Sequence, residues 1–140
     1  MDNKETYFNS NEFRELLQRY EHSLQIGRQE YFESEELTDI AEFYYKDNRM
    51  DEAISVLDYA IHLHPGAAMP LVFRGRMALI DGNDVELARH YVDMIVDRLD
   101  LDCLYLQAEI MIAEKDVEGA DRFLRDNLER IDEDDVPDYI

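Results

Sequence analysis

Four histidines, one cysteine and many carboxylates are the side chains in this sequence that could perform chemistry. His62 and His64 are two positions apart, and residues two apart on a helix point about 200° away from each other. They therefore cannot hold one metal ion between them. His22 and His90 have no cysteine, histidine or aspartate at ligand spacing. We expect neither a metal site nor a cofactor.

A cysteine nucleophile and a carboxylate pair are the remaining candidates for catalysis. Cys103 lies in the apolar-rich run LDCLYL with no nucleophile signature around it, so we expect an inert side chain in the core. The chain has 34 acidic residues, yet no pair stands out as a general acid and base. Glycine-rich phosphate loops and serine nucleophile motifs are absent. The sequence therefore predicts a protein that is not an enzyme.

The charge balance limits the partners. With 34 acidic against 14 basic residues, the formal charge is −20, which disfavours nucleic acid and anionic lipid. The N-terminus has no signal-peptide pattern, and no run of 18 apolar residues could span a membrane. A single cysteine suggests a reducing compartment. We expect a cytoplasmic protein that binds neither nucleic acid nor membrane.

Apolar residues recur at helical spacing over residues 34–66, in two runs separated by a polar turn. The first run follows the i, i+3, i+4, i+7 spacing of one helix face, with Ser34 as the expected N-cap. Asn48 tolerates the left-handed conformation that ends a helix, and Pro65 closes the second run. The apolar positions of this helix–turn–helix unit are Leu37, Ile40, Ala41 and Tyr44, then Ala53, Ile54, Leu57, Ala60 and Ile61.

The same unit recurs over residues 68–100 and 101–132. Small residues mark the equivalent positions, which are Ala41, Gly75 and Ala108 in the first helices and Ala53, Ala88 and Ala120 in the second helices. The spacings are 34 and 33 in the first set but 35 and 32 in the second, which indicates one additional residue in the second turn, at Asp84 or its neighbour. Small side chains at these positions let two helices cross closely.

This pattern resembles the tetratricopeptide repeat, a helix–turn–helix with a characteristic order of large, small and aromatic residues. The first unit matches at Leu37, Ile40, Ala41, Tyr44, Ala53, Leu57, Ala60 and Pro65. The other units depart at Arg74, Ala78, Gln107, Asn127 and Asp132. The resemblance covers residues 34–132. It implies an all-α fold, a right-handed α-solenoid of three helix pairs.

Both ends of the chain extend beyond the three pairs. A further helix is expected over residues 9–27, with its N-cap among Asn9, Ser10 and Asn11 and Gly27 at its end. It would cover the open apolar face of the first unit. Residues 133–140 are expected to start a further repeat of a longer array or to form a tail. Together these segments make one domain over residues 1–140, with about seven helices.

The resemblance implies a non-enzymatic scaffold that binds a peptide or helix on the concave surface formed by the first helix of each pair. One alternative is an N-terminal structural module of a longer repeat protein, which could self-associate through its last helix. Another is the non-catalytic part of an enzyme whose chemistry lies beyond Ile140. Leu79 and Ile112 could equally pack against neighbouring helices. The candidate peptide-binding residues are Thr38, Glu42, Tyr45, Lys46, Val72, Arg76, Leu79, Tyr105, Glu109 and Ile112.

One well-known use of three such repeats is a basic and amide clamp for the acidic C-terminus of heat-shock chaperones. The matching positions here are Thr38, Glu42, Phe73, Asp102 and Leu106. None is lysine, arginine or asparagine, so this ligand is not expected. The sequence instead predicts a neutral-to-basic partner with apolar anchors at Tyr45, Leu79 and Tyr105. Glu42 and Glu109 would set the charge preference.

The excess of negative charge leads to a first prediction, on salt. Like charges on a small body repel one another, and salt screens this repulsion over a Debye length of about 8 Å at physiological ionic strength. We therefore expect the Tm, followed by circular dichroism, to rise from low salt to a few tenths molar sodium chloride. A flat or falling Tm would show that the acidic side chains are already paired or lie too far apart to repel one another.

Overall fold

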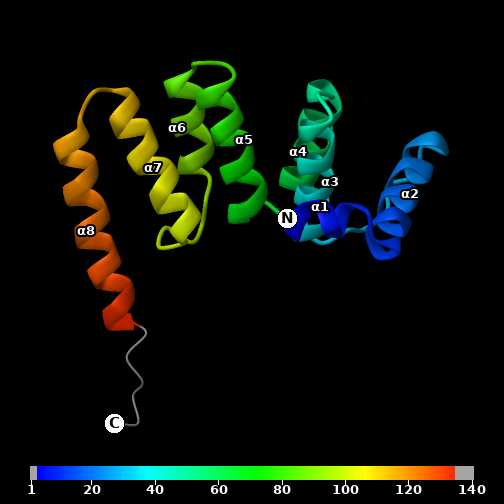
Figure 1. The fold of residues 1–140 in the computed structure, drawn as a ribbon, viewed down its shortest axis with the longest axis horizontal. Helices are drawn as coiled ribbons and strands as arrows, with labels where there is room; N and C mark the ends of the chain where they lie inside the picture. Colours follow the sequence, from blue (N-terminus) through cyan, green and yellow to red (C-terminus); the bar gives the residue numbers. More distant parts are fainter. Residues whose placement is uncertain (1–2, 135–140) are drawn as a thin grey trace, which may run out of the picture. The chain divides into compact units, whose positions relative to one another are not determined.

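The computed structural model describes residues 3–134, and every regular element in this range is an α-helix. The absence of strands among these residues confirms the all-α class. Figure 1 labels the helices α1 to α8 and colours them along the chain. They are α1 (Asn3–Phe8), α2 (Asn11–Gln25), α3 (Ser34–Lys46), α4 (Met50–Leu63), α5 (Ala68–Ile80), α6 (Val85–Asp93), α7 (Leu101–Ala113) and α8 (Val117–Asp134).

The chain divides into two compact units, Met1–Leu63 and His64–Ile140, where the sequence predicts one domain. Pro65, where the sequence predicts the close of the first pair, is the second residue of the second unit. In the first unit α3 packs against α4. In the second unit α5 packs against α6 and α7 against α8, while α7 also contacts both α5 and α6.

Each turn between paired helices contains one residue with a left-handed backbone. The φ angles are 60° at Asn48, 48° at Asn83 and 67° at Lys115. Each of these residues lies five positions before a buried alanine of the following helix, namely Ala53, Ala88 and Ala120. The turns therefore repeat in the same register as the small residues.

The second turn carries the additional residue that the spacing predicts. In the first turn the Arg49 N–H donates to the carbonyl of Tyr44, and in the third the Asp116 N–H donates to Met111, both five residues back. In the second turn the equivalent bond runs six residues back, from Asp84 to Ala78. The N···O distance of this hydrogen bond is 2.9 Å in all three turns. The first helix of each pair is therefore capped by an equivalent main-chain bond, with or without the additional residue.

Gly75 marks a close helix approach in the second unit. A Cβ atom placed there would lie 2.7 Å from Leu106 Cδ2 of α7 and 3.6 Å from the Ala88 carbonyl oxygen of α6. The site is buried. The other small residues of the two sets are also buried, as close crossings would require: Ala41, Ala53, Ala88, Ala108 and Ala120.

The helix ends confirm some predictions and correct others. Ser10 caps α2 by accepting a hydrogen bond from the Phe13 N–H at 3.2 Å, and Gly27 follows the helix with φ 66°. Ser34, however, is the first residue of α3 and not its N-cap. Glu33 is the N-cap instead, because it forms a reciprocal capping box with Glu36.

The helix α6 ends well inside the unit that the sequence predicts over residues 68–100. Its last residue is Asp93, so Ile95 lies beyond the helix although its side chain is buried. The Val96 N–H donates to the Gly66 carbonyl at 3.0 Å instead of continuing the helix. The guanidinium of Arg98 donates to the carbonyl of Val92 at 2.7 Å. This bond provides a partner for one of the carbonyl groups that the end of a helix leaves without an intrahelical hydrogen bond.

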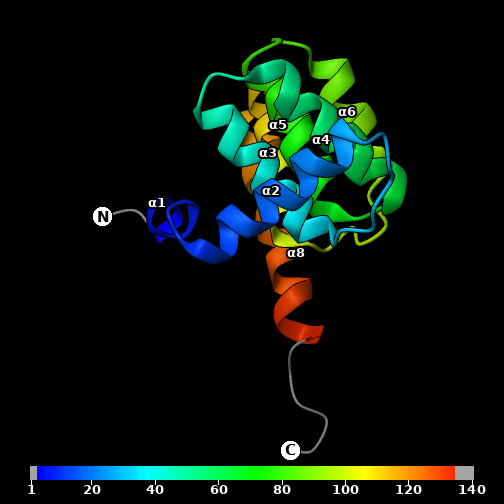
Figure 2. The same cartoon turned by 90° about the vertical axis from the view of Figure 1, so that its right-hand side faces the viewer.

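Large aromatic side chains join α2 to α3 in the first unit. The rings of Phe13 and Phe43 lie 5.3 Å apart, and Phe13 is fully buried. The hydroxyl of Tyr44 donates to Glu21 of α2 at 2.8 Å. Figure 2 shows α1 and α2 following one another through the bend at residues 9 and 10. α1 is absent from the predicted elements, because six residues are too few for a recognisable periodic pattern.

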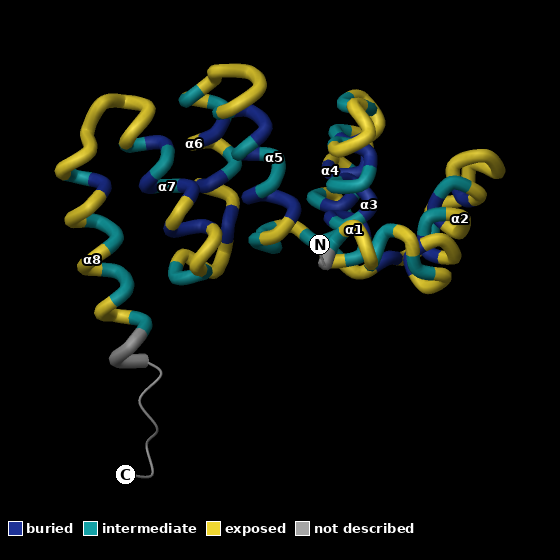
Figure 3. The backbone as a smooth tube through the Cα atoms, in the orientation of Figure 1, coloured by how far each residue is buried: buried dark blue, intermediate teal, exposed yellow. Residues whose placement is uncertain are grey.

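The last helix is the least buried of the second unit. Figure 3 shows α8 as mainly intermediate or exposed, and among its described side chains Ala120 is the buried one. The helix runs to Asp134, past the end at residue 132 that the sequence predicts. Residues 135–140 of the predicted further repeat or tail lie outside the described residues.

The close helix crossings generate a stability prediction. Ala108→Leu places three additional carbon atoms at a buried position of α7, so we expect a loss of about 1–3 kcal/mol in the free energy of unfolding. Ala113→Leu makes the same change at an exposed position of the same helix, and we expect less than about 0.5 kcal/mol there. Urea unfolding compares the two variants. Equal effects would contradict the predicted repeat register.

Candidate functional site

Four candidate binding residues lie on α3, and one of them is in the core. Thr38 is buried, and its hydroxyl donates to the Ser34 carbonyl at 2.7 Å, so it is not available to a partner. Glu42 and Lys46 form an ion pair at 3.7 Å on the helix surface. Tyr45 is partly exposed.

The helix α1 lies against part of this α3 surface. The Lys4 ammonium donates to Asp39 at 2.6 Å. The Phe8 ring meets the Phe43 ring edge-on at 5.7 Å, and the Lys46 ammonium lies 5.6 Å from the centre of the same Phe8 ring. A segment of the chain itself therefore covers a surface that the sequence predicts to be a peptide groove.

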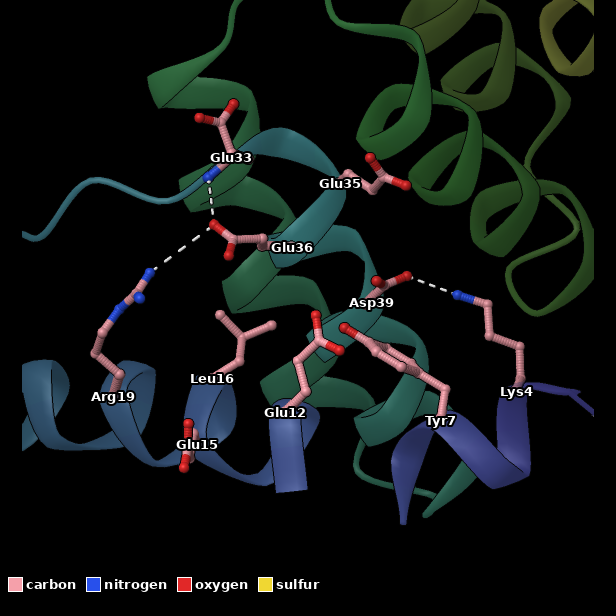
Figure 4. Close-up of a pocket in the computed structure, with 10 residues that line it drawn as sticks. All are labelled: Lys4, Tyr7, Glu12, Glu15, Leu16, Arg19, Glu33, Glu35, Glu36 and Asp39. Carbon is pink, nitrogen blue, oxygen red and sulfur yellow. Dashed lines mark hydrogen bonds and ion pairs between the residues drawn. The ribbon is translucent and has the colours of Figure 1, made fainter. Parts of the chain in front are cut away.

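A pocket of about 860 Å³ opens between α1, α2 and α3, and we call it the acidic pocket (Figure 4). Leu16 and Tyr7 contribute its apolar surface, and Lys4 and Arg19 are its two cations. Arg19 reaches Glu36 at 3.8 Å. Six carboxylates against two cations give the lining a formal charge of −4, which would repel an acidic ligand. The carboxylates are Glu12, Glu15, Glu33, Glu35, Glu36 and Asp39.

An ion pair ties α5 to α7 in the second unit. Arg76 and Glu109 make two contacts, 3.2 Å between Nη2 and Oε1 and 3.4 Å between Nε and Oε2. Both side chains are more than one third exposed, at 36% and 38%. Both residues are among the predicted site residues, and the structure brings them together. The pair links the outer faces of the two helices.

Exposed apolar side chains flank this ion pair. On α7, Leu101, Tyr105 and Ile112 are 46%, 41% and 51% exposed, and their positions fall within about 40° of each other around the helix. On α5, Ile80 lies one turn beyond Arg76 and is 66% exposed. We call this surface the α5–α7 face, and its members are Arg76, Leu79, Ile80, Leu101, Tyr105, Glu109 and Ile112.

The predicted site residues of α5 have different surroundings. Val72 is only 4% exposed, so it belongs to the core and not to the α5–α7 face. Leu79 is partly exposed beside Ile80. Leu101 is missing from the predicted site residues, although its place four residues before Tyr105 on the same helix would have indicated it.

The described residues contain no group of three or more metal-ligating side chains placed to hold an ion. Cys103 is buried, and the amide of Gln107 donates to its sulfur at 3.3 Å. Burial raises the pKa of the Cys103 thiol, while the hydrogen bond from Gln107 opposes this effect. None of the helices in residues 3–134 has both the length and the apolar character that crossing a bilayer requires.

No protein-family model, no curated protein and no solved structure matches this chain. The tetratricopeptide resemblance therefore rests on the residues and their spacing alone. The acidic pocket and the α5–α7 face are candidate functional surfaces of the described residues.

The burial of Cys103 generates a prediction on its reactivity. The thiolate is the reactive form, and both a raised pKa and burial reduce its access to reagents. We expect iodoacetamide to alkylate Cys103 in the native protein at least about 100-fold more slowly than in urea. Glutathione under the same two conditions controls for the effect of urea on the reagent. Equal rates in native and unfolded protein would show a reactive cysteine.

Proposed function

We propose that this chain is a non-enzymatic protein-binding scaffold that binds its partner on the α5–α7 face. One observation carries the proposal: Leu101, Tyr105 and Ile112 form an exposed apolar stripe on a helix whose other side is in the core. Single exposed apolar residues are ordinary, but an aligned set on adjacent helices is typical of interaction surfaces.

The side chains of the α5–α7 face indicate which class of partner it would bind. Tyr105 offers a large ring and loses little conformational entropy on binding. Tyrosine is one of the residue types that contribute most of the binding energy at interfaces. The Arg76–Glu109 pair crosses the face and provides both a donor and an acceptor. A peptide or amphipathic helix with apolar side chains at i, i+4 and i+7 would match the stripe. The charge of −20 favours a neutral-to-basic partner over the acidic C-terminus of heat-shock chaperones.

The repeated turns support a more specific architecture for the scaffold. Left-handed residues at equivalent places in three turns, each followed by a buried small residue, agree with helix pairs built to one plan. We therefore propose a right-handed α-solenoid of tetratricopeptide type, acting in the cytoplasm. In such an array the first helices of successive pairs line one surface, and α5 and α7 are two of these first helices.

Self-association is the second candidate function, and α8 favours it. Phe123, Leu124, Leu128 and Ile131 follow one face of this helix, and each of them is only partly buried. In a repeat array the last helix needs a capping element or a neighbour to cover such a face. A molar mass that increases with protein concentration in sedimentation would favour this candidate over the α5–α7 face.

The α5–α7 face generates a binding prediction. A peptide array compares how strongly the protein binds basic amphipathic peptides and acidic C-terminal peptides. For the best peptide, we expect Tyr105→Ala and Ile112→Ala each to weaken binding about tenfold, or about 1.4 kcal/mol, by fluorescence anisotropy. Glu109→Ala should reduce the preference for basic peptides.

A matched control comes from the second unit itself. Val117 is 62% exposed at the start of α8 and does not belong to the α5–α7 face, so Val117→Ala should leave binding unchanged. Selective capture of acidic C-terminal peptides, undiminished by Glu109→Ala or Glu42→Ala, would exclude the proposed partner class.

A further inference from the structure

The short helix α1 covers part of α2 and α3 through one face of its own. Lys4, Tyr7 and Phe8 are partly buried, whereas Glu5 and Thr6 are exposed. The spacing i, i+3, i+4 places the three partly buried residues on one side of the helix. α1 therefore packs as an amphipathic segment, in the way that a helical peptide binds a groove.

Aromatic rings form the apolar part of this contact. The Phe8 ring lies 4.9 Å from the Phe13 ring of α2 and 5.7 Å from the Phe43 ring of α3. The Tyr7 ring lies 5.3 Å from the same Phe13 ring. Phe13 is fully buried, and α1 supplies two of the rings that lie against it. Departure of α1 would therefore expose apolar rings of α2 and α3, which a partner could cover again.

An ion pair forms the polar part of the contact. The Lys4 ammonium donates to Asp39 Oδ1 at 2.6 Å (Figure 4), and the Asp39 side chain is only 13% exposed. A largely buried carboxylate that loses its partner is costly. Asp39 also lines the acidic pocket, where Lys4 and Arg19 are the two cations. Without Lys4, one cation would face six carboxylates, a formal charge of −5, so the surface favours a basic group in that place.

The contacts of these side chains hold α1 in place, because its own helical stability is small. The helix has six residues, and isolated helices shorter than about 12–15 residues are marginal in water. Residues 9 and 10 connect it to α2, and the Ser10 N–H donates to the Tyr7 carbonyl there at 2.9 Å. Terminal segments open at a smaller free-energy cost than the core of a fold. We expect α1 to leave its surface while α2 and α3 stay folded.

We propose that α1 is an intramolecular ligand that covers a second binding surface, formed by Phe13, Asp39 and Phe43, until a partner helix displaces it. We call this the α1-covered surface. The partner helix carries a basic residue followed three and four residues later by aromatic residues, as α1 does. Its basic group pairs with Asp39, and its rings pack on Phe13 and Phe43. This surface lies in the first unit and shares no residue with the α5–α7 face.

The test measures, by fluorescence anisotropy, how a fluorescein-labelled peptide copy of residues 1–10 binds to the full chain. In the wild type the tethered α1 competes at an effective concentration on the order of millimolar, so the peptide binds weakly. Phe8→Ala and Lys4→Glu each remove one anchor of α1 from the chain, and the peptide supplies that anchor instead. We expect both variants to bind the peptide at least about tenfold more tightly than the wild type, the factor for a surface that is free in about one wild-type molecule in ten.

Glu5→Ala is the matched control, because Glu5 is on the exposed side of α1. It should leave peptide binding as weak as in the wild type. Circular dichroism and urea unfolding check that the Phe8→Ala and Lys4→Glu chains are folded. Lys4→Glu keeps the test decisive if Phe8→Ala unfolds the first unit, because the Lys4 side chain is 41% exposed.

Charge reversal tests the predicted ion pair. The Lys4→Glu chain should bind the natural peptide about fivefold or more tightly than a peptide that itself carries Lys4→Glu. In an Asp39→Lys chain this preference should reverse, because the glutamate of the altered peptide then meets a lysine. A purely structural α1 would give no such reversal.

Three results would overturn the proposal. Equal or absent peptide binding in the wild type, Phe8→Ala and Lys4→Glu would show that α1 is a permanent part of the first unit. A peptide preference that Asp39→Lys leaves unchanged would place the peptide elsewhere. A dimer that Lys4→Glu dissociates in sedimentation would make α1 of a second copy the occupant. Tyr105→Ala should change none of these results, so failure here is distinguishable from failure at the α5–α7 face.

Discussion

The second unit depends on a helix crossing that leaves no room for a side chain. At Gly75, α5 comes so close to α6 and α7 that an added Cβ would lie 2.7 Å from Leu106. The neighbouring residue, Arg76, points away from this crossing and reaches Glu109 across the outer surface. The crossing therefore determines which side chains of α5 and α7 are core and which form the α5–α7 face. Val72 and Tyr105, at equivalent places in the two helices, are on opposite sides of that division.

Local features of the structure were predictable from the sequence, because local spacing and turn chemistry determine them. The predicted helix–turn–helix units start at residues 34, 68 and 101, where α3, α5 and α7 begin, and Asn48 adopts its predicted left-handed backbone. The contacts of α1 with α3 were not predictable, since Lys4 and Phe8 meet their partners only after folding. Helical periodicity likewise could not show that Thr38 is buried, because burial depends on which neighbour covers that face.

The two units present surfaces of different character. The acidic pocket is lined by carboxylates around Lys4 and Arg19, whereas the α5–α7 face is apolar around one balanced ion pair. The acidic pocket disfavours an acidic partner by charge repulsion. The α5–α7 face disfavours it because its one arginine, Arg76, is already paired with Glu109. Arg74 is half-buried where the repeat pattern expects an aliphatic residue, and its guanidinium lies 5.2 Å from the centre of the Tyr91 ring.

The buried phenols of the first unit have a consequence in alkali. An unfolded tyrosine ionises with a pKa of about 10, whereas burial raises the pKa of Tyr20 to about 12. The native state then holds a proton that the unfolded state releases, so the stability that Tyr20 contributes is intact below pH 10 and is lost as the pH rises toward 12. The chain has no tryptophan. Phenolate absorbance would therefore report alkaline unfolding free of indole overlap, mainly from the first unit, which holds six of the nine tyrosines.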